Sequence, residues 1–167
     1  MLIPEATQKM IDFYHGNLHD IAHFLKVYAY AKTIAELEGV SHEMQERCEL
    51  AAILHDIACP LCRKKYGEAA GHLQEKEGPA LAEAFLAELN CPEPLKSRIA
   101  FLVGHHHTTV GVDGLDWQIL LEADFLVNAD EGHATGKAIE AMLHSVYRTK
   151  SGRRLLESVY LRGRIAE

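Results

Sequence analysis

Apolar residues recur with helical spacing along most of the chain. In residues 19–38 one stripe carries Ile21, Leu25 and Tyr28, and apolar positions three or four residues apart lie on one face of an α-helix. Gly39 follows where the end of a helix favours a left-handed residue. No segment shows the sustained alternation of β-branched residues that predicts a strand. The pattern therefore predicts an all-α protein.

Caps and helix breakers divide the chain into about six to eight predicted helices. Ser41 is a candidate N-cap, Pro60 is expected to end the helix that follows it, and Asp116 is expected to cap a later helix. The predicted helices cover residues 19–38, 42–57, 73–89, 94–103, 116–128, 133–148 and 151–164, with a loop or short helix over 58–71. We expect a single compact bundle, residues 1–167, in which the helices of segment 133–164 pack on the core.

Length and charge restrict the class of protein. A chain of 167 residues is expected to form one domain with a proper hydrophobic core. Its hydrophobic fraction of 48% is typical of a globular protein, and no apolar run reaches the roughly 20 residues of a membrane span. The N-terminus lacks a signal-peptide pattern, so we expect a cytoplasmic protein. The net charge of −7 argues against binding to nucleic acid or to an anionic membrane.

The four cysteines are expected to be free thiols, since no secretory pattern accompanies them. Cys59 and Cys62 have the spacing of a redox pair or of half a zinc site. A structural zinc site needs a second close pair, and Cys48 and Cys91 do not form one. We therefore interpret Cys59 and Cys62 as two thiols in a loop after the second predicted helix.

His55 and Asp56 close an apolar helical run, residues 50–54. Burying an ionised carboxylate costs several kcal/mol unless a partner compensates its charge. A divalent cation is such a partner, and imidazole together with carboxylate suits iron, manganese, nickel or zinc. The pair is therefore a candidate for metal ligation, although a single pair of this kind is not specific.

The same residue types recur on three other predicted helices. His23 lies on a mostly apolar helix, Asp124 interrupts the apolar run 119–127, and three histidines, 105–107, follow another apolar helix. Each alone has an ordinary explanation, such as a hydrogen-bonded core histidine or a buried ion pair. Together they indicate a metal centre built from side chains of facing helices. Three consecutive histidines cannot all face one way, so at least one is expected to point away from it.

These residues resemble, in their order and local context, the HD-domain superfamily of metal-dependent phosphohydrolases. Three motifs carry the resemblance: residues 23–31 resemble the first helix of the family, residues 51–58 its central motif, and residues 121–126 its closing motif. The resemblance spans about residues 19–130. It implies one metal ion held by His23, His55, Asp56 and Asp124. It also implies that Asp56 can bridge to a second ion.

Superfamily members with two metal ions have further histidines between the central motif and the last aspartate. The resemblance implies His72, His105 and His106 as the candidates in this chain, with His107 as an alternative. The expected cofactor is one or two divalent ions, and iron, manganese, nickel, zinc and magnesium all remain open.

The chemistry implied is hydrolysis by a metal-activated water. Imidazoles and carboxylates leave coordination positions open, and a metal-bound water has a pKa lowered towards about 7. His55 and Asp56 are the catalytic candidates, with Asp56 orienting the nucleophile. The expected partner is a small phosphorylated substrate, a phosphate ester or anhydride of a nucleotide or related metabolite.

Basic residues are expected to bind the remaining phosphate oxygens of such a substrate. Lys150 and Arg154 are the candidates, with Arg153 beside them, and Lys64 and Lys65 are alternatives. A solvated charged surface explains these residues equally well.

Two other functions fit the same residues. Some proteins with this helical fold and ligand order are di-iron oxygenases. A module that binds a metal or ligand without turnover is the third possibility. Phosphate release by metal-loaded protein distinguishes the hydrolase, and oxygen consumption distinguishes the oxygenase.

Overall fold

The computed structural model describes residues 2–162, which form helices joined by short connections. The elements are α1 (Leu2–Phe13), α2 (Leu18–Glu38), α3 (His42–Leu54), α4 (Cys59–Tyr66), α5 (Gly71–Glu88), α6 (Glu93–Val103), α7 (Leu115–Glu131), α8 (Gly136–Ser145), α9 (Lys150–Leu156) and a π-helical segment, η1 (Glu157–Leu161). No strand occurs among these residues, so the predicted all-α class is confirmed. No helix within residues 2–162 is both long enough and apolar enough to cross a membrane.

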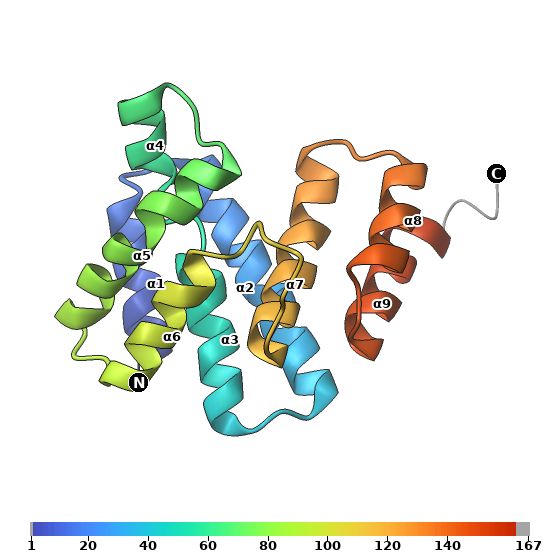
Figure 1. Ribbon diagram of the computed structural model, residues 1–167, viewed down its shortest axis with the longest axis horizontal. Coiled ribbons are helices and arrows are strands. Elements are labelled where there is room, and N and C mark those ends of the chain that lie inside the picture. Colours follow the sequence, from blue (N-terminus) through green and yellow to red (C-terminus); the bar gives the residue numbers. More distant parts are fainter. Residues whose placement is uncertain (1, 163–167) are drawn as a thin grey trace.

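Helices α2, α3 and α7 form the centre of the fold. α2 packs against both α3 and α7, and α3 and α7 also pack against each other. The apolar run 50–54 of α3 is fully buried, because a run without polar positions needs neighbours on more than one side of the helix. Figure 1 shows α4 and α5 on one side of this centre and α8 and α9 on the other.

The connection between α2 and α3 follows the predicted capping pattern. Gly39 adopts the left-handed conformation, with φ 67°, at the end of α2, where a residue without a Cβ is free of strain. The Ser41 side chain accepts a hydrogen bond from the backbone N–H of Met44, as an N-cap residue does. Both predictions are confirmed.

The predicted helix 42–57 ends earlier than expected. α3 stops at Leu54, and Pro60 lies in the first turn of α4 instead of ending the preceding helix. Proline is tolerated in that turn because its missing N–H would have no partner there. His55 and Asp56 therefore occupy the bend between two helices.

The prediction that Asp116 caps the helix carrying Asp124 is wrong. Gly114 is the N-cap residue of α7, and Asp116 lies in the first turn. The buried Asp116 carboxylate accepts hydrogen bonds from Arg98 at 2.7 and 2.9 Å and from Arg47 at 3.3 Å. Two guanidinium groups thus compensate the free-energy cost of burying this carboxylate.

Differences also occur towards both ends of the chain. The prediction omits helix α1, although Ile3, Ala6, Met10 and Phe13 recur at helical spacing and contact the core. The predicted helix 133–148 begins later, because Thr135 caps it. Residues 163 and 164 of the last predicted helix, and residues 1 and 165–167 of the predicted domain, lie outside the described part.

All four cysteines are buried free thiols, as predicted. Cys59 and Cys62 lie on the short helix α4 rather than in a loop. Burial raises the pKa of Cys59, and the nearby Asp56 carboxylate raises it further. The Cys59 thiol is therefore protonated and unreactive at neutral pH.

A fully buried carboxylate, that of Glu122 on α7, fixes the turn between α8 and α9. It accepts hydrogen bonds from the Gln118 side chain at 2.7 Å and from the backbone N–H groups of Arg148 at 2.6 Å and Thr149 at 2.9 Å. The Thr149 hydroxyl also donates to it. Dipolar donors on several sides reduce the desolvation cost of the carboxylate, so the turn is held firmly against α7.

Gly152 allows this close approach, and we expect Gly152→Ala to destabilise the protein. An added Cβ would lie 1.9 Å from Glu122 Oε2 and 2.7 Å from Thr149 Oγ1. Overpacking of this kind costs about 1–3 kcal/mol in the free energy of unfolding. Urea denaturation followed by circular dichroism measures the loss. The matched control is Ser151→Ala, which should change the unfolding free energy by less than about 0.5 kcal/mol; equal effects of the two variants would contradict this explanation.

Candidate metal centre

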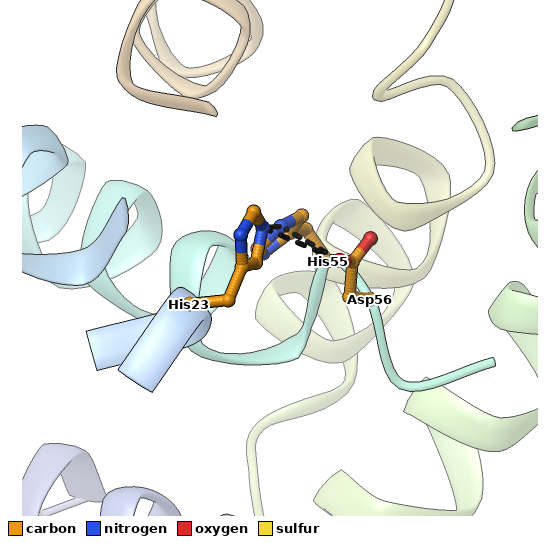
Figure 2. Close-up of side chains that lie close together, drawn as sticks. All are labelled: His23, His55 and Asp56. Carbon is orange, nitrogen blue, oxygen red and sulfur yellow. Dashed lines mark hydrogen bonds and ion pairs between the residues drawn. The ribbon is translucent and has the colours of Figure 1, made fainter. Parts of the chain in front are cut away.

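Five histidine and aspartate side chains from four places in the fold meet at its centre. His23 comes from α2, His55 and Asp56 from the bend after α3, His106 from the turn after α6, and Asp124 from α7. Four of the five are buried, and the Asp56 side chain is 21% exposed. Figure 2 shows His23 pointing towards His55 and Asp56. The structure thus brings together the four residues of the first implied ligand set and one histidine of the triplet.

The distances within this group suit a single cation. His23 Nε2 lies 3.1 Å from His55 Nε2, 3.3 Å from Asp56 Oδ2 and 3.4 Å from Asp124 Oδ1. His55 Nε2 lies 3.4 Å from Asp124 Oδ1 and 3.5 Å from Asp56 Oδ2. Metal–ligand bonds of about 2.0–2.2 Å place neighbouring donor atoms roughly 3–3.5 Å apart. The two imidazole nitrogens and an Asp56 oxygen therefore form one group at ligand spacing, and Asp124 Oδ1 lies next to both nitrogens.

The hydrogen bonds of the three buried imidazoles direct their lone pairs inward. Nδ1 of His55 and Nδ1 of His106 each lie 2.7–2.8 Å from a backbone carbonyl three residues earlier. Nδ1 of His23 lies 2.8 Å from a carboxylate oxygen of Glu131. A carbonyl or carboxylate oxygen only accepts, so Nδ1 carries the proton, and in the neutral ring Nε2 carries a lone pair. This arrangement is typical of histidines that bind metals through Nε2.

Two buried polar atoms of the group lack a hydrogen-bond partner. Within the described part of the chain, His106 Nε2 and Asp124 Oδ1 are buried and have no donor or acceptor in hydrogen-bond geometry. An unsatisfied buried polar atom costs about 1–3 kcal/mol, and more if it is charged. A divalent cation would satisfy both atoms, so the donor set of this site fits a metal ion.

Asp56 is shared by two groups of candidate ligands. Its Oδ2 atom faces His23 and His55, whereas its Oδ1 atom lies 3.3 Å from His106 Nε2. His107 completes the second group, because its ring nitrogen, that of His106 and an Asp56 oxygen lie within 4.8 Å of one another. The two oxygens of one carboxylate thus point towards two positions that could each hold an ion.

Charge coupling within the group shifts the pKa values of its members. Burial alone would lower the pKa of His23, but the carboxylates of Asp124 and Asp56 outweigh this effect and raise the pKa to about 9. Burial alone would raise the pKa of Asp124, but the adjacent imidazoles of His23 and His55, each 3.4 Å away, hold that pKa well below its ordinary range. Desolvation and the neighbouring His106 lower the pKa of His107 to about 4. At neutral pH both the Asp124 carboxylate and the His107 imidazole are therefore in the form that binds metals.

Glu131 belongs to the site but escapes prediction from the sequence. Besides binding Nδ1 of His23, its carboxylate accepts from Lys26 Nζ at 3.2 Å. Glu131 follows Asp124 by seven positions on α7, which is two turns of helix, so the two carboxylates lie on the same face. That spacing is the signal that could have revealed it. A carboxylate on the outer nitrogen orients a ligating imidazole and raises its basicity.

The structure does not bring His72 and His105 to the centre. His72 is exposed in the first turn of α5. The His105 ring stacks on Phe101 with ring centroids 4.1 Å apart, and it contacts the edge of Trp117. Successive side chains point in different directions in the turn after α6. Neighbouring histidines therefore differ in whether they reach Asp56. The structure thus groups His106 and His107, and not His72 or His105, with Asp56.

A pocket of about 150 Å³ opens beside the group. Its lining consists of His106, His107, Thr109, Leu121, Asp124, Phe125, Asn128, Met142 and Val146. A cavity of this volume accommodates a group about the size of a benzene ring. Apart from histidines at the centre, this lining carries no cationic side chain.

The basic residues expected to bind substrate do not line this pocket. Lys150 and Arg154 are exposed on α9. Arg153 donates to backbone carbonyls of the α8–α9 region. Lys64 and Lys65 are exposed on α4, and Lys65 pairs with a glutamate of α5 at 2.8 Å. Their predicted contact with substrate therefore has no support from this placement.

Comparisons with known proteins agree with the geometry. A family model, the HD domain, matches residues 20–135. A solved structure from an uncultured Thermotogales bacterium, titled as a predicted HD superfamily hydrolase, is similar with a TM-score of 0.65 and 24% identity, over 95% of this chain and 83% of that chain. This likeness shows the fold. No curated protein matches the sequence.

Replacing His106 should weaken metal binding far more than replacing His105. His106 presents a buried, unpaired Nε2 to Asp56, so we expect His106→Ala to raise the Kd for Mn²⁺ by at least about 10–100-fold. His105→Ala removes aromatic contacts and a hydrogen bond to the Phe101 carbonyl, none of them at the centre, and should leave the Kd within about threefold. Titration calorimetry of metal-free protein measures both. A larger loss for His105→Ala would contradict the placement of the triplet.

Metal affinity should rise with pH between about 7 and 9. In metal-free protein the pKa of His23 is about 9, against 6.5 in the unfolded chain. Protonated His23 therefore stabilises the fold fully below pH 6.5, and this contribution is lost as the pH rises through about 9. A metal ion must displace the same proton, so affinity should rise about tenfold per pH unit for each proton released. Calorimetry with Mn²⁺ in buffers of different ionisation enthalpy counts the protons. His23→Gln should lower the slope by about one proton, and an affinity that stays flat over this range would refute the coupling.

Proposed function

This chain belongs to the HD domain family, and from this membership and its buried histidine–aspartate centre we propose that it is a metal-dependent phosphohydrolase. The proposed substrate is a phosphate ester or anhydride of a nucleotide or related small metabolite. The proposed reaction is the attack of water on phosphorus. The sharing of Asp56 between two candidate ligand groups is the observation that carries this proposal.

Two divalent ions are the proposed cofactors. The residues on the Oδ2 side of Asp56, namely His23, His55 and Asp124, would hold one ion, and His106 and His107 on the Oδ1 side would hold the second. Iron, manganese, nickel, zinc or magnesium are compatible with these ligands, and imidazole-rich sites favour the transition metals among them. Asp56, as the residue common to both groups, would contribute a ligand to each ion.

The protein side chains prepare the site for hydrolysis. Divalent ions, when bound, make a water acidic enough to act as a nucleophile near neutral pH and neutralise charge on phosphate oxygens. Asp56 supplies the shared carboxylate and orients the reacting groups. Glu131 and the backbone carbonyls hold the outer nitrogens of the imidazoles, so the inner nitrogens keep their direction while charge develops.

The pocket beside the centre suits a phosphoryl group. Its volume of about 150 Å³ is small compared with the roughly 300–1,000 Å³ of pockets that bury whole metabolites. Phe125 and Met142 contribute apolar walls, whereas Thr109 and Asn128 contribute neutral polar groups. Apolar walls exclude water from the reacting phosphate and strengthen its interaction with bound cations.

Metal-loaded protein should release phosphate from simple esters, and Asp56→Ala should abolish this activity. We expect a loss in kcat/KM of at least about 10³-fold, roughly 4 kcal/mol of transition-state stabilisation. The assay measures inorganic phosphate released from p-nitrophenyl phosphate and from nucleoside monophosphates after reconstitution with Mn²⁺, Fe²⁺, Ni²⁺, Zn²⁺ or Mg²⁺.

The matched control is Asp130→Ala, which removes an exposed carboxylate from the same helix, α7, and should leave kcat/KM within about twofold. No phosphate release with any of these metals, accompanied by oxygen consumption in the iron-loaded protein, would overturn the proposal in favour of an oxygenase.

A further inference from the structure

A second pocket adjoins the pocket beside the metal centre. It has a volume of about 410 Å³ and lies between the loop that precedes α7 and the end of α8. Its lining includes Thr109, Asp113, Gln118, Ser145, Val146 and Arg148. Thr109 and Val146 also line the smaller pocket, so the two pockets meet at a shared boundary. A molecule with one end beside Asp124 can therefore extend past these two residues.

The charged residues that line the second pocket are Asp113 and Arg148. Asp113 lines it, but both oxygens of Asp113 bind Arg98, at 2.6 and 2.9 Å. Arg98 also binds Asp116, which Arg47 contacts as well, so two guanidinium groups balance these two carboxylates. Arg148 is the remaining charged residue of the lining. Arg148 is thus the cation that this pocket presents.

The Arg148 guanidinium has no carboxylate partner among residues 2–162. It donates to the backbone carbonyls of Ser145 at 2.8 Å and Tyr147 at 3.2 Å. These bonds occupy only two of its five N–H donors. An exposed guanidinium with free donors is suited to bind a planar carboxylate or a phosphate through two parallel hydrogen bonds.

The backbone of Arg148 is held in a fixed position. Its N–H donates to the buried carboxylate of Glu122 at 2.6 Å, next to the same contact from Thr149. Glu122 lies on α7 two positions before Asp124. One rigid helix therefore sets the position of both a metal-centre carboxylate and the base of the Arg148 side chain, which favours recognition at a defined distance.

We propose that Arg148 determines substrate specificity by binding a second anionic group of the substrate, a phosphate or a carboxylate. This inference rests on the proposed function, because the phosphoryl group that reacts lies in the smaller pocket. The substrate class is then a small molecule with two separated anionic groups, one at each pocket. Lys150 and Arg154, the cations predicted from the sequence, line neither pocket.

Binding of compounds that cannot be hydrolysed tests this inference independently of turnover. The probes are alkane bisphosphonates with three to six methylene groups and the matching alkyl monophosphonates, titrated calorimetrically into Mn²⁺-loaded protein. We expect at least one bisphosphonate to bind more tightly than its monophosphonate. Arg148→Gln should weaken bisphosphonate binding by about 10- to 100-fold, the effect of losing hydrogen bonds to a charged group, and leave monophosphonate binding within about twofold.

Two further variants separate recognition from a structural role. Arg148→Lys keeps the charge but loses the forked geometry of the guanidinium. It should therefore keep only part of the preference for a bisphosphonate over its monophosphonate. Lys137→Gln removes an exposed positive charge from α8, away from both pockets. This control should leave the preference for a bisphosphonate unchanged. Thermal unfolding of each variant shows whether the fold persists.

The inference is overturned if no bisphosphonate binds more tightly than its monophosphonate, or if Arg148→Gln weakens both classes equally. Arg148 would then only cap the carbonyls at the end of α8. The proposed hydrolysis fails by a different result, the absence of phosphate release from any ester, so the two outcomes can be told apart.

Discussion

The centre of this protein holds two carboxylates, Asp56 and Asp124, whose negative charge must be compensated by neighbouring groups. Both lie among imidazole nitrogens, Asp124 buried and Asp56 partly exposed, and an ionised carboxylate at such a position needs positive charge nearby. Because the partners come from α2, α3, α7 and the turn after α6, the central helices must pack so that these groups meet. The same packing of the central helices is consequently needed both for the core and for the site.

Much of this arrangement could be predicted from the sequence because it depends on local pattern. Polar residues that interrupt apolar helices reveal His23, His55 and Asp124, and each belongs to a regular helix or its end. His106 was also among the predicted candidates, but the choice among the three histidines 105–107 required the structure, because they lie in the turn after α6 where successive side chains point in different directions. The predicted choice of His105 followed an analogy, and the stacking on Phe101 shows why this side chain turns away.

Residues that act through neighbours were the hardest to predict. Glu131, Glu122 and Arg98 are ordinary charged residues in the sequence, and their importance comes from partners far away along the chain. Arg148 lies in a turn whose course depends on the buried Glu122 carboxylate. Helical periodicity contains no information about such contacts, because they depend on how separate helices pack. Substrate recognition is therefore less visible in the sequence than the reaction centre.

The separation of the ligands along the chain has a consequence for chain entropy. His23 and Asp124 enclose about 100 residues, yet their side chains lie 3.4 Å apart. A cation joined to both acts as a reversible cross-link, and closing a loop of about 100 residues removes unfolded-state entropy worth about 4.7 kcal/mol on the disulfide model. The stability of the fold and the chemistry of the site would thus both depend on the same dissociable ion.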